Sequence, residues 1–308
     1  MKSIRIKHVD AFTKKPFTGN YAAVVVDANG LSDDEMHLIA REMNVSETAF
    51  ILQPSIADAD IQIRWFTPSS EVPLCGHATV AGFHALAEEN MAGMTTNGQH
   101  YFKLQTKSGI LPVRVEKNFH GIAVEFDLPK PRFSLKKKIP PALISALRLS
   151  KKDIELNLPT TADAYLYLPV KGLKILQSIR PDYEALEIIL KHLKAQGICV
   201  FSLETIEKTS AVHSRFFAPG LGIQEDPVTG SANGPLGVYL STYAMKAGYA
   251  VVCRELADGR VEFIGEQGDT IDRPGRVKIR LRYDKRSFEK VSIEGEAVTV
   301  WNGTMEIY

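Results

Sequence analysis

The sequence predicts an α+β protein built from two copies of one unit, and two observations support this prediction. First, the chain has 308 residues, which is long for a single core and sufficient for two domains. Second, the two halves repeat one pair of motifs in the same order. The motifs are RWFTP at 64–68 with CGHA at 75–78, and RFFAP at 215–219 with TGSA at 229–232. Such a repeat indicates a duplication.

The composition is that of a soluble globular protein, with 44% apolar and 24% charged residues. A formal net charge of +1 provides no field that would attract nucleic acid or an anionic membrane. The one basic run, Lys136 to Lys138, lies beside prolines and is typical of a solvated linker. No apolar stretch is long enough to span a bilayer, and the N-terminus lacks the apolar block of a signal peptide. We therefore expect a cytoplasmic protein with no nucleic-acid or membrane partner.

The first half alternates between strand and helix patterns. Residues 4–9 alternate apolar and polar side chains, which predicts a strand at a sheet edge. A capping box over 32–35 begins a helix that ends near Asn44. Further strands are predicted at 22–26, 48–52, 64–67, 102–115 and 122–126.

The segment 76–90 is different, because it is small and apolar on every side, which predicts a helix that is buried all round. A Pro-rich linker is predicted over 129–141. The second half then repeats this order and includes a second small-residue helix that begins at Gly230. The remaining predictions for that half are helices at 142–149 and 181–195 and strands at 164–168, 198–203, 214–217 and from 250 to the end.

The two glycine-opened helix starts, Gly76 and Gly230, predict a pocket for an anion. Glycine lets a ligand approach the backbone closely, and the first helical N–H groups have no internal partner and carry the positive end of the helix dipole. Carboxylates bind well at such places. The alternative is that each glycine only closes a tight turn, and the duplication favours the pocket.

A proton-transfer enzyme would need a carboxylate or an imidazole of tuned pKa in this pocket. The nearest candidates are His77, Asp226 and Ser231, together with Glu47 from the end of an earlier connection. Taken alone, Glu47 could be an exposed strand residue and His77 a satisfied helix-start residue. If Glu47 is buried, desolvation should raise its pKa towards the working pH.

Several motifs, in this order, resemble the phenazine-biosynthesis isomerase family (PhzF-like), which is related to diaminopimelate epimerase. They are DAF at 10–12, FTGN at 17–20, SET at 46–48, RWFTP at 64–68, EVPLCGHAT at 71–79 and EDPVTGSA at 225–232. The resemblance covers essentially the whole chain. Tyr21 departs from it, because the family usually has proline at this position.

The resemblance implies a diaminopimelate epimerase-like fold with two pseudo-symmetric lobes, each a mixed β-sheet rolled around a central α-helix. The lobes would be 1–128, joined by the last strand at about 298–308, and 129–297, with the active site in the cleft between them. It also implies a homodimer.

The resemblance further implies an isomerase that moves a proton between carbons of a small carboxylate, as in trans-2,3-dihydro-3-hydroxyanthranilate, with no metal or organic cofactor. Glu47 would be the acid/base and would act with His77 and Asp226. The predicted substrate-binding residues are Asn20, Ser46, Gly76, Gly230 and Ser231.

Two other functions remain open. Related racemases use a cysteine at each helix start, but here Cys75 is matched by Thr229, whose hydroxyl is too weak an acid or base for that role. Cys75 is then expected to be a packing residue, although an amino-acid racemase or epimerase that uses Cys75 with Glu47 stays possible. The other function is a non-catalytic binder of small carboxylates.

The remaining motifs argue against other sites. Gly220 and Gly222 lack the third glycine of a dinucleotide turn, and the eight histidines show no ligand-spaced pair beside a carboxylate or cysteine. Cys199 and Cys253 lie in apolar segments and are expected in the core. Three widely spaced cysteines also indicate a reducing compartment.

Overall fold

The computed structural model describes residues 2–136, 139–285 and 287–307. The chain divides into two compact units. Unit 1 comprises Met1–Asp127 and Ile293–Tyr308, and unit 2 comprises Leu128–Ser292. The last strand, β18 (Ser287–Ile307), contributes residues to both units.

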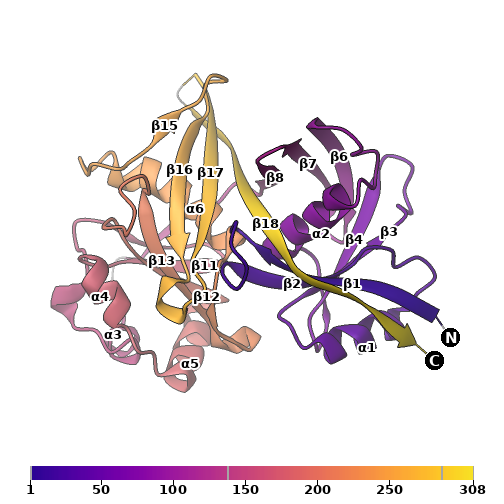
Figure 1. Ribbon diagram of the computed structural model, residues 1–308. Coiled ribbons are helices and arrows are strands. Elements are labelled where there is room, and N and C mark those ends of the chain that lie inside the picture. The colour runs from indigo at the N-terminus through magenta and orange to yellow at the C-terminus, as the bar shows by residue number, and fades with distance from the viewer. Residues whose placement is uncertain (1, 137–138, 286, 308) are drawn as a thin grey trace. The chain divides into compact units, whose positions relative to one another are not determined.

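Unit 1 is a mixed sheet that closes on itself (Figure 1). β1 lies between β18 and β2 and is antiparallel to both, β2–β3 and β4–β6 are parallel pairs, and β8 pairs with β18 to complete the circle. The strands besides β18 are β1 (Lys2–Ala11), β2 (Asn20–Val25), β3 (Thr48–Leu52), β4 (Ile61–Phe66), β5 (Glu71–Val72), β6 (Gly98–Thr106), β7 (Gly109–Asn118) and β8 (Gly121–Leu128).

The sheet of unit 1 surrounds helix α2 (Gly76–Glu88), as predicted from its composition. Residues 77–87 are all buried, because the helix presents small or apolar side chains to the sheet on every side. Helix α1 (Asp33–Met43) packs on the sheet from outside through Met36 and Ile39. The predicted capping box is present, since the Ser32 hydroxyl and the Glu35 carboxylate each accept the other residue's backbone N–H.

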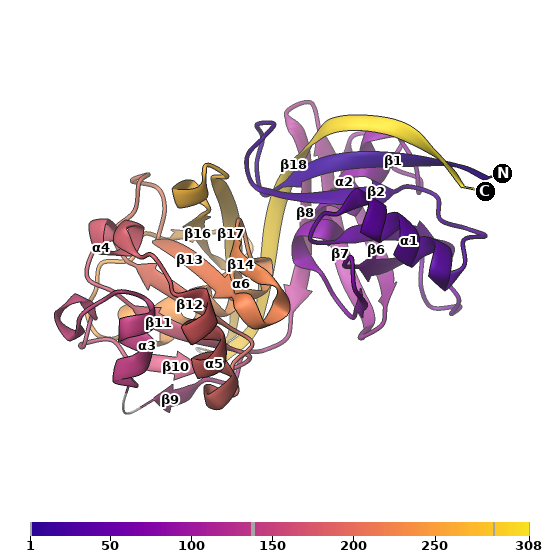
Figure 2. The same ribbon diagram turned by 90° about the horizontal axis from the view of Figure 1, so that it is seen from below.

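Unit 2 has its own mixed sheet, and helix α6 (Gly230–Tyr239) packs on β16 and β17. Its other strands and helices are β9 (Ser134–Lys136), β10 (Thr160–Ala162), β11 (Tyr165–Pro169), β12 (Gly197–Ser202), β13 (Val212–Ala218), β14 (Ile223–Asp226), β15 (Arg254–Glu255), β16 (Val261–Gln267), β17 (Gly275–Asp284), α3 (Pro141–Ala146), α4 (Leu173–Ser178) and α5 (Tyr183–Leu193). Helices α3, α4 and α5 share one hydrophobic core with β11 and β12 (Figure 2). Short 3₁₀ turns lie at Lys151–Asp153, Pro219–Leu221 and Asp269–Ile271.

The strand pairings confirm the two pseudo-symmetric lobes. In unit 1 the series β2, β3, β4, β6, β7 is joined by parallel, antiparallel, parallel and antiparallel pairs. In unit 2 the series β11, β12, β13, β16, β17 follows the same alternation. The central helix comes at the same point of both series, before β6 and before β16.

One side-chain arrangement is also duplicated. In each unit an arginine from the repeated motif forms a two-bond salt bridge with a glutamate of the next strand and lies over an aromatic ring. The guanidinium carbon is 5.1 Å from the ring centre in unit 1 and 5.0 Å in unit 2. The groups are Arg64, Glu71 and Phe66 in unit 1, and Arg215, Glu225 and Phe217 in unit 2.

The structure corrects two predictions about burial. The N-terminal strand is not at an edge, because the C-terminal strand returns to pair with it, and the alternation within one strand carries no information on such a distant partner. Cys253 is exposed and not in the core, because its segment precedes β15 without forming a strand, whereas Cys199 is buried in β12 as expected.

The structure also refines the element boundaries. The predicted strand at 102–115 is two strands joined by a turn, and the helix that begins at Gly230 changes at Leu240–Ala244 to a π-helical turn. Of the predicted linker, Ser134–Lys136 forms β9, and Lys137 and Lys138 lie outside the described residues.

The duplicated arginines should contribute unequally to stability. Arg215 and Glu225 are 4% and 7% exposed, and Arg215 also donates to the carbonyl oxygens of Leu176 and Ile179 at the end of α4. Arg215→Ala leaves a buried carboxylate unpaired and should lower the free energy of unfolding by about 3–5 kcal/mol. Arg64 is 20% exposed, so Arg64→Ala should cost only about 1–2 kcal/mol.

Hydrogen exchange of individual peptides in rising urea measures this difference, because it reports the opening of each unit separately. Arg215→Ala should weaken protection in β12 and β13, and Arg64→Ala should weaken protection in β3 and β4 to a smaller extent. An equal loss in the two variants would contradict the ranking.

Candidate active site

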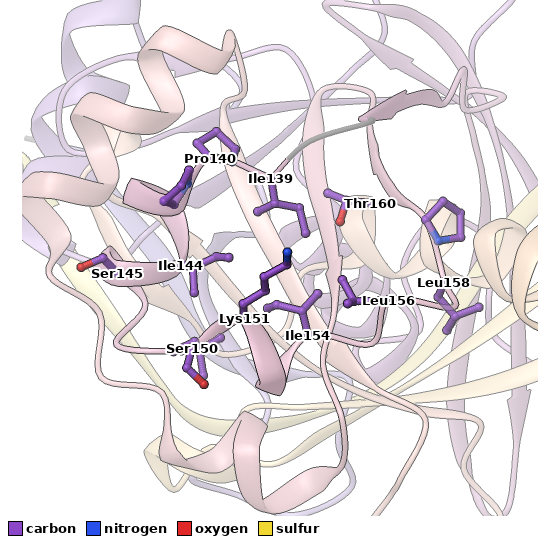
Figure 3. A pocket seen from close by; sticks show the side chains of 13 residues that line it. Ile139, Pro140, Ile144, Ser145, Ser150, Lys151, Ile154, Leu156, Leu158 and Thr160 are labelled. Atoms are coloured by element: carbon purple, nitrogen blue, oxygen red, sulfur yellow. The ribbon is translucent and has the colours of Figure 1, made fainter.

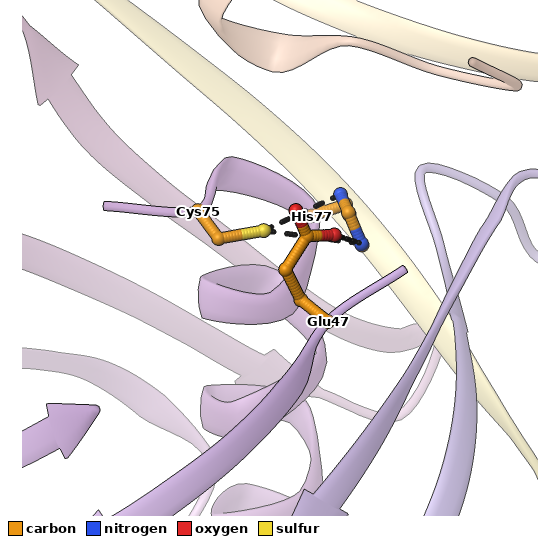
Figure 4. Close-up of side chains that lie close together, drawn as sticks. All are labelled: Glu47, Cys75 and His77. Carbon is orange, nitrogen blue, oxygen red and sulfur yellow. Dashed lines mark hydrogen bonds and ion pairs between the residues drawn. The ribbon is translucent and has the colours of Figure 1, made fainter. Parts of the chain in front are cut away.

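Five residues predicted for the site gather at the start of α2 in unit 1. Asn20 opens β2, Ser46 and Glu47 form the end of the connection from α1 to β3, and Gly76 and His77 are the first residues of α2. Figure 4 shows the glutamate and the imidazole meeting beside this helix start.

The loop before β2 holds Asn20 in place. Gly19 has a φ of +66°, and a Cβ there would lie 2.2 Å from the carbonyl oxygen of Ala11, so only glycine fits. The buried Asp10 carboxylate accepts the backbone N–H of Phe17 at 2.6 Å. Asn20 is therefore buried with its Nδ2 3.2 Å from His77 Nδ1, which orients the ring.

The opposite edge of the imidazole faces Glu47 and Ser46. His77 Nε2 is 3.2 Å from Glu47 Oε2 and 3.3 Å from Ser46 Oγ. The side chains of His77 and Glu47 are only 8% and 13% exposed. Glu47 is thus not the exposed strand residue that its sequence context allowed, and His77 makes contacts beyond the capping of its own helix.

Cys75 joins the same cluster, which corrects its expected role as a packing residue. It is the N-cap of α2, yet its side chain makes no capping hydrogen bond. Its Sγ lies 3.5 Å from His77 Nδ1 and 3.9 Å from His77 Nε2. The thiol is buried but lies against the predicted acid/base pair (Figure 4).

The direction of the pKa shift of Glu47 is the reverse of the expected one. Burial acts to raise the pKa of Glu47, but the contact with the His77 imidazole and the smaller contributions of Ser46 and Cys75 outweigh it. The pKa of Glu47 is therefore lowered, and the side chain is a carboxylate at neutral pH. Desolvation acts on the pKa of Glu47 in the predicted direction, but the sequence does not show that His77 lies close enough to outweigh it.

The other two members of the cluster shift upwards. Burial acts to lower the pKa of His77, but the Cys75 sulfur, when it is ionised, and the Glu47 carboxylate raise it well above its usual value. Burial, helped by the Glu47 charge, raises the pKa of Cys75 to about 11, so the sulfur carries its proton at neutral pH. The resting cluster is an imidazolium–carboxylate pair beside a neutral thiol.

The three predicted residues of unit 2 lie together at the start of α6. Asp226 accepts a short hydrogen bond from the Thr229 hydroxyl, and the Ser231 hydroxyl is 3.1 Å from that of Tyr165. The Gln267 amide accepts the Thr229 N–H at 3.1 Å and donates to its hydroxyl at 3.0 Å. Gly230, the first residue of α6, is thereby held by neighbours on both sides.

Some contacts of these sites were missed in the sequence. Tyr165 and Gln267 come from β11 and β16, which have no motif that would have marked them. Cys75 was recognised only by its place in the repeat. The structure also brings Glu47, Cys75 and His77 together, with one possible metal-ligand atom of each residue within 4.8 Å of the others. The spacing of the histidines in the sequence did not predict this group. That one substrate contacts both helix starts stays a prediction.

A cavity of about 940 Å³ lies in unit 2 but contains none of the predicted residues (Figure 3). Its walls are aliphatic side chains and prolines around Lys151, from α3 to β10. Within the residues that the structure describes, no helix is both long and apolar enough to cross a membrane.

Three comparisons with known proteins bear on this geometry. An uncharacterised isomerase of Clostridium acetobutylicum is 36% identical over 99% of both chains. A crystal structure of a PhzF-family phenazine biosynthesis protein from Bacillus anthracis is 33% identical and covers all of both chains with a TM-score of 0.86. A probable proline racemase from Agrobacterium radiobacter has the same fold, with a TM-score of 0.60 over 99% of this chain and 93% of that one at 12% identity.

The family model described as "phenazine biosynthesis-like protein" matches residues 9–303. With this match over nearly the whole chain and relatives that are named isomerases, the chain belongs to the phenazine biosynthesis-like (PhzC/PhzF) family of isomerases.

Proposed function

We propose that this isomerase moves a proton between two carbons of a small carboxylate substrate, with Glu47 as the acid/base and without a cofactor. The observation that carries the proposal is the buried Glu47–His77 pair at the start of α2. It offers a base that is already ionised, next to a cation that can stabilise the charge the base creates.

The reaction has two proton transfers at one carboxylate. A Glu47 oxygen takes a proton from a carbon that is flanked by a carbonyl or a double bond, and the electron pair spreads over the conjugated system. Glu47 then returns the same proton to a carbon further along that system. One carboxylate suffices because both carbons can be reached from the same face of the substrate.

His77 is suited to stabilising the anion between these two steps. Its raised pKa keeps it protonated, so it can donate a hydrogen bond to an oxygen that becomes negative. The free N–H groups at the start of α2 favour the substrate carboxylate at the same place. In unit 2 we assign Gly230 and Ser231, at the start of α6, to substrate binding by the same argument from the repeat, and Asp226 stays a predicted catalytic partner of Glu47.

Exchange of carbon-bound hydrogen in D2O tests the role of Glu47. Wild-type protein should exchange at least one member of a panel of small carboxylates, including trans-2,3-dihydro-3-hydroxyanthranilate and common amino acids. Glu47→Gln should slow the exchange by about 10²- to 10⁴-fold, which is the usual contribution of a general acid/base. Nuclear magnetic resonance of the substrate measures the rate.

Glu42→Gln is the matched control, because Glu42 is an exposed glutamate of α1 and should exchange at the wild-type rate. A panel member that binds but is not exchanged by the wild type would support the non-catalytic binder instead. Equal exchange rates for Glu47→Gln and wild type would show that Glu47 is not the base.

The pH dependence of kcat/KM tests the ion pair. Activity requires ionised Glu47, so the acid limb should have its midpoint below 4.5, the ordinary value for glutamate. It also requires protonated His77, so the alkaline limb should lie above 6.5. In His77→Asn the alkaline limb should disappear. The acid limb should move above 4.5, because burial still raises the pKa of Glu47 while the His77 imidazole no longer lowers it.

An acid limb that stays below 4.5 in His77→Asn would show that the imidazole does not set the pKa of Glu47. The substitution is suitable because asparagine is smaller than histidine and fills the same buried position without a charge. Circular dichroism at each pH separates loss of activity from loss of fold.

An epimerase that uses Cys75 with Glu47 is the second candidate, and it is favoured by the position of the Cys75 sulfur in the cluster. Inversion at one carbon needs a second acid on the other face, and the neutral thiol could donate that proton. Cys75→Ala should then abolish inversion of the substrate carbon. Under the isomerase proposal the same variant should still move the proton between carbons. Chiral chromatography measures the inversion, and nuclear magnetic resonance measures the movement of the proton.

A further inference from the structure

Glu47, Cys75 and His77 also form a set of metal ligands, and this set suggests a way in which the proposed reaction can be inhibited. One oxygen, one sulfur and one nitrogen lie within 4.8 Å of one another. Thiolate, imidazole and carboxylate are the three ligand types of protein-bound Zn²⁺, and three protein ligands leave a fourth position open. We propose that a thiophilic divalent cation, with Zn²⁺ as the probe, binds here and blocks proton transfer.

The distances between the donor atoms are close to those of a tetrahedral site. Bonds of about 2.3 Å to sulfur and about 2.0–2.2 Å to nitrogen and oxygen place the ligand atoms roughly 3.4–3.6 Å apart. His77 Nε2 is 3.9 Å from Cys75 Sγ and 3.2 Å from Glu47 Oε2. The sulfur–nitrogen separation is longer than this range and the nitrogen–oxygen separation is shorter, so binding requires the imidazole to shift within the cluster.

The surroundings leave these donor atoms available. Cys75 does not use its side chain to cap α2, and Glu47 Oε2 is buried without a well-aligned hydrogen bond in the described part of the chain. The Asn20 amide lies against the other ring nitrogen, Nδ1, with its nitrogen nearest; with its oxygen turned to that side it would accept the Nδ1–H that a metal-bound histidine donates. Ser46 Oγ, 3.3 Å from Nε2, is a further oxygen beside the cluster.

Binding and catalysis exclude each other at this site. Coordination releases two protons to solvent, one from the Cys75 thiol and one from Nε2 of the His77 imidazolium, and takes up a lone pair of Glu47, so the base can no longer accept a proton from carbon. It also occupies the nitrogen with which His77 faces Glu47. Inhibition, but not binding, rests on the proposed function.

Binding is measured first, with the purified full chain. Zn²⁺ competition against a chromogenic chelator should give one site per chain, and Co²⁺ should produce the visible absorption of a tetrahedral ion with a thiolate charge-transfer band. Cys75→Ser should remove the charge-transfer band and weaken Zn²⁺ binding at least tenfold. Glu47→Gln should keep the band and also weaken binding, which provides a second variant if Cys75→Ser does not fold.

Cys253→Ser is the matched control, because Cys253 is an exposed thiol remote in sequence from the cluster. It should leave both the stoichiometry and the cobalt spectrum unchanged. Unaltered binding in Cys75→Ser, or loss of the band in Cys253→Ser, would overturn the site.

Inhibition is measured second, in the D2O exchange assay. Zn²⁺ should stop the exchange at the concentration at which it fills the site, and EDTA should restore the full rate, while EDTA alone should change nothing. Faster exchange with Zn²⁺ would overturn the inhibitory role. If no compound is exchanged, the proposed isomerase fails while the binding experiment still decides whether the metal site exists.

Discussion

The burial of a helix that is apolar on every side is the constraint on which unit 1 depends. Such a helix has no face for solvent, so the sheet must go around it, and β18 returns to β1 to complete the circle. The sides of α2 are then covered by strands, and its ends are the places where polar groups can meet it. Its N-terminal end carries the unpaired N–H groups, so the site forms there.

Duplication explains why the scaffold is symmetric although the chemistry is not. The arginine–glutamate bridge and the alternation of strand pairs are kept in both units, because each copy must close the same kind of sheet. The two helix starts have diverged. One has Cys75 and His77 beside Glu47, and the other has Thr229 held by Gln267 and the Asp226 carboxylate. Of the contacts described at the two helix starts, those in unit 1 include an imidazole, and those in unit 2 are made by hydroxyl, amide and carboxylate groups.

Much of the fold could be predicted because its signals are local. The capping box at Ser32, the strand at 48–52 and the small-residue helix at Gly76 each depend on residues that are adjacent in sequence. The pairing of β1 with β18 depends on a segment far away in the sequence, and no local pattern contains it. Cys253 is exposed because its apolar segment forms no strand, which apolar composition alone does not reveal. The same distinction separates the site residues from their chemistry. Glu47 was predicted as the acid/base from its motif, but the direction of its pKa shift depended on how close His77 would be.

For the proposed reaction, the lowered pKa of Glu47 raises the question of how so weak a base would remove a proton from carbon. The same contact that lowers the pKa of Glu47 also keeps His77 protonated, so the two effects are linked. When a substrate oxygen becomes negative, His77 can turn its hydrogen bond towards that oxygen. Glu47 then loses the contact with His77 that had lowered its pKa. Desolvation is no longer outweighed, so the affinity of Glu47 for a proton rises as the proton is transferred. In the proposed mechanism the ion pair keeps Glu47 ionised in the free enzyme, and the developing negative charge on the substrate frees Glu47 from His77.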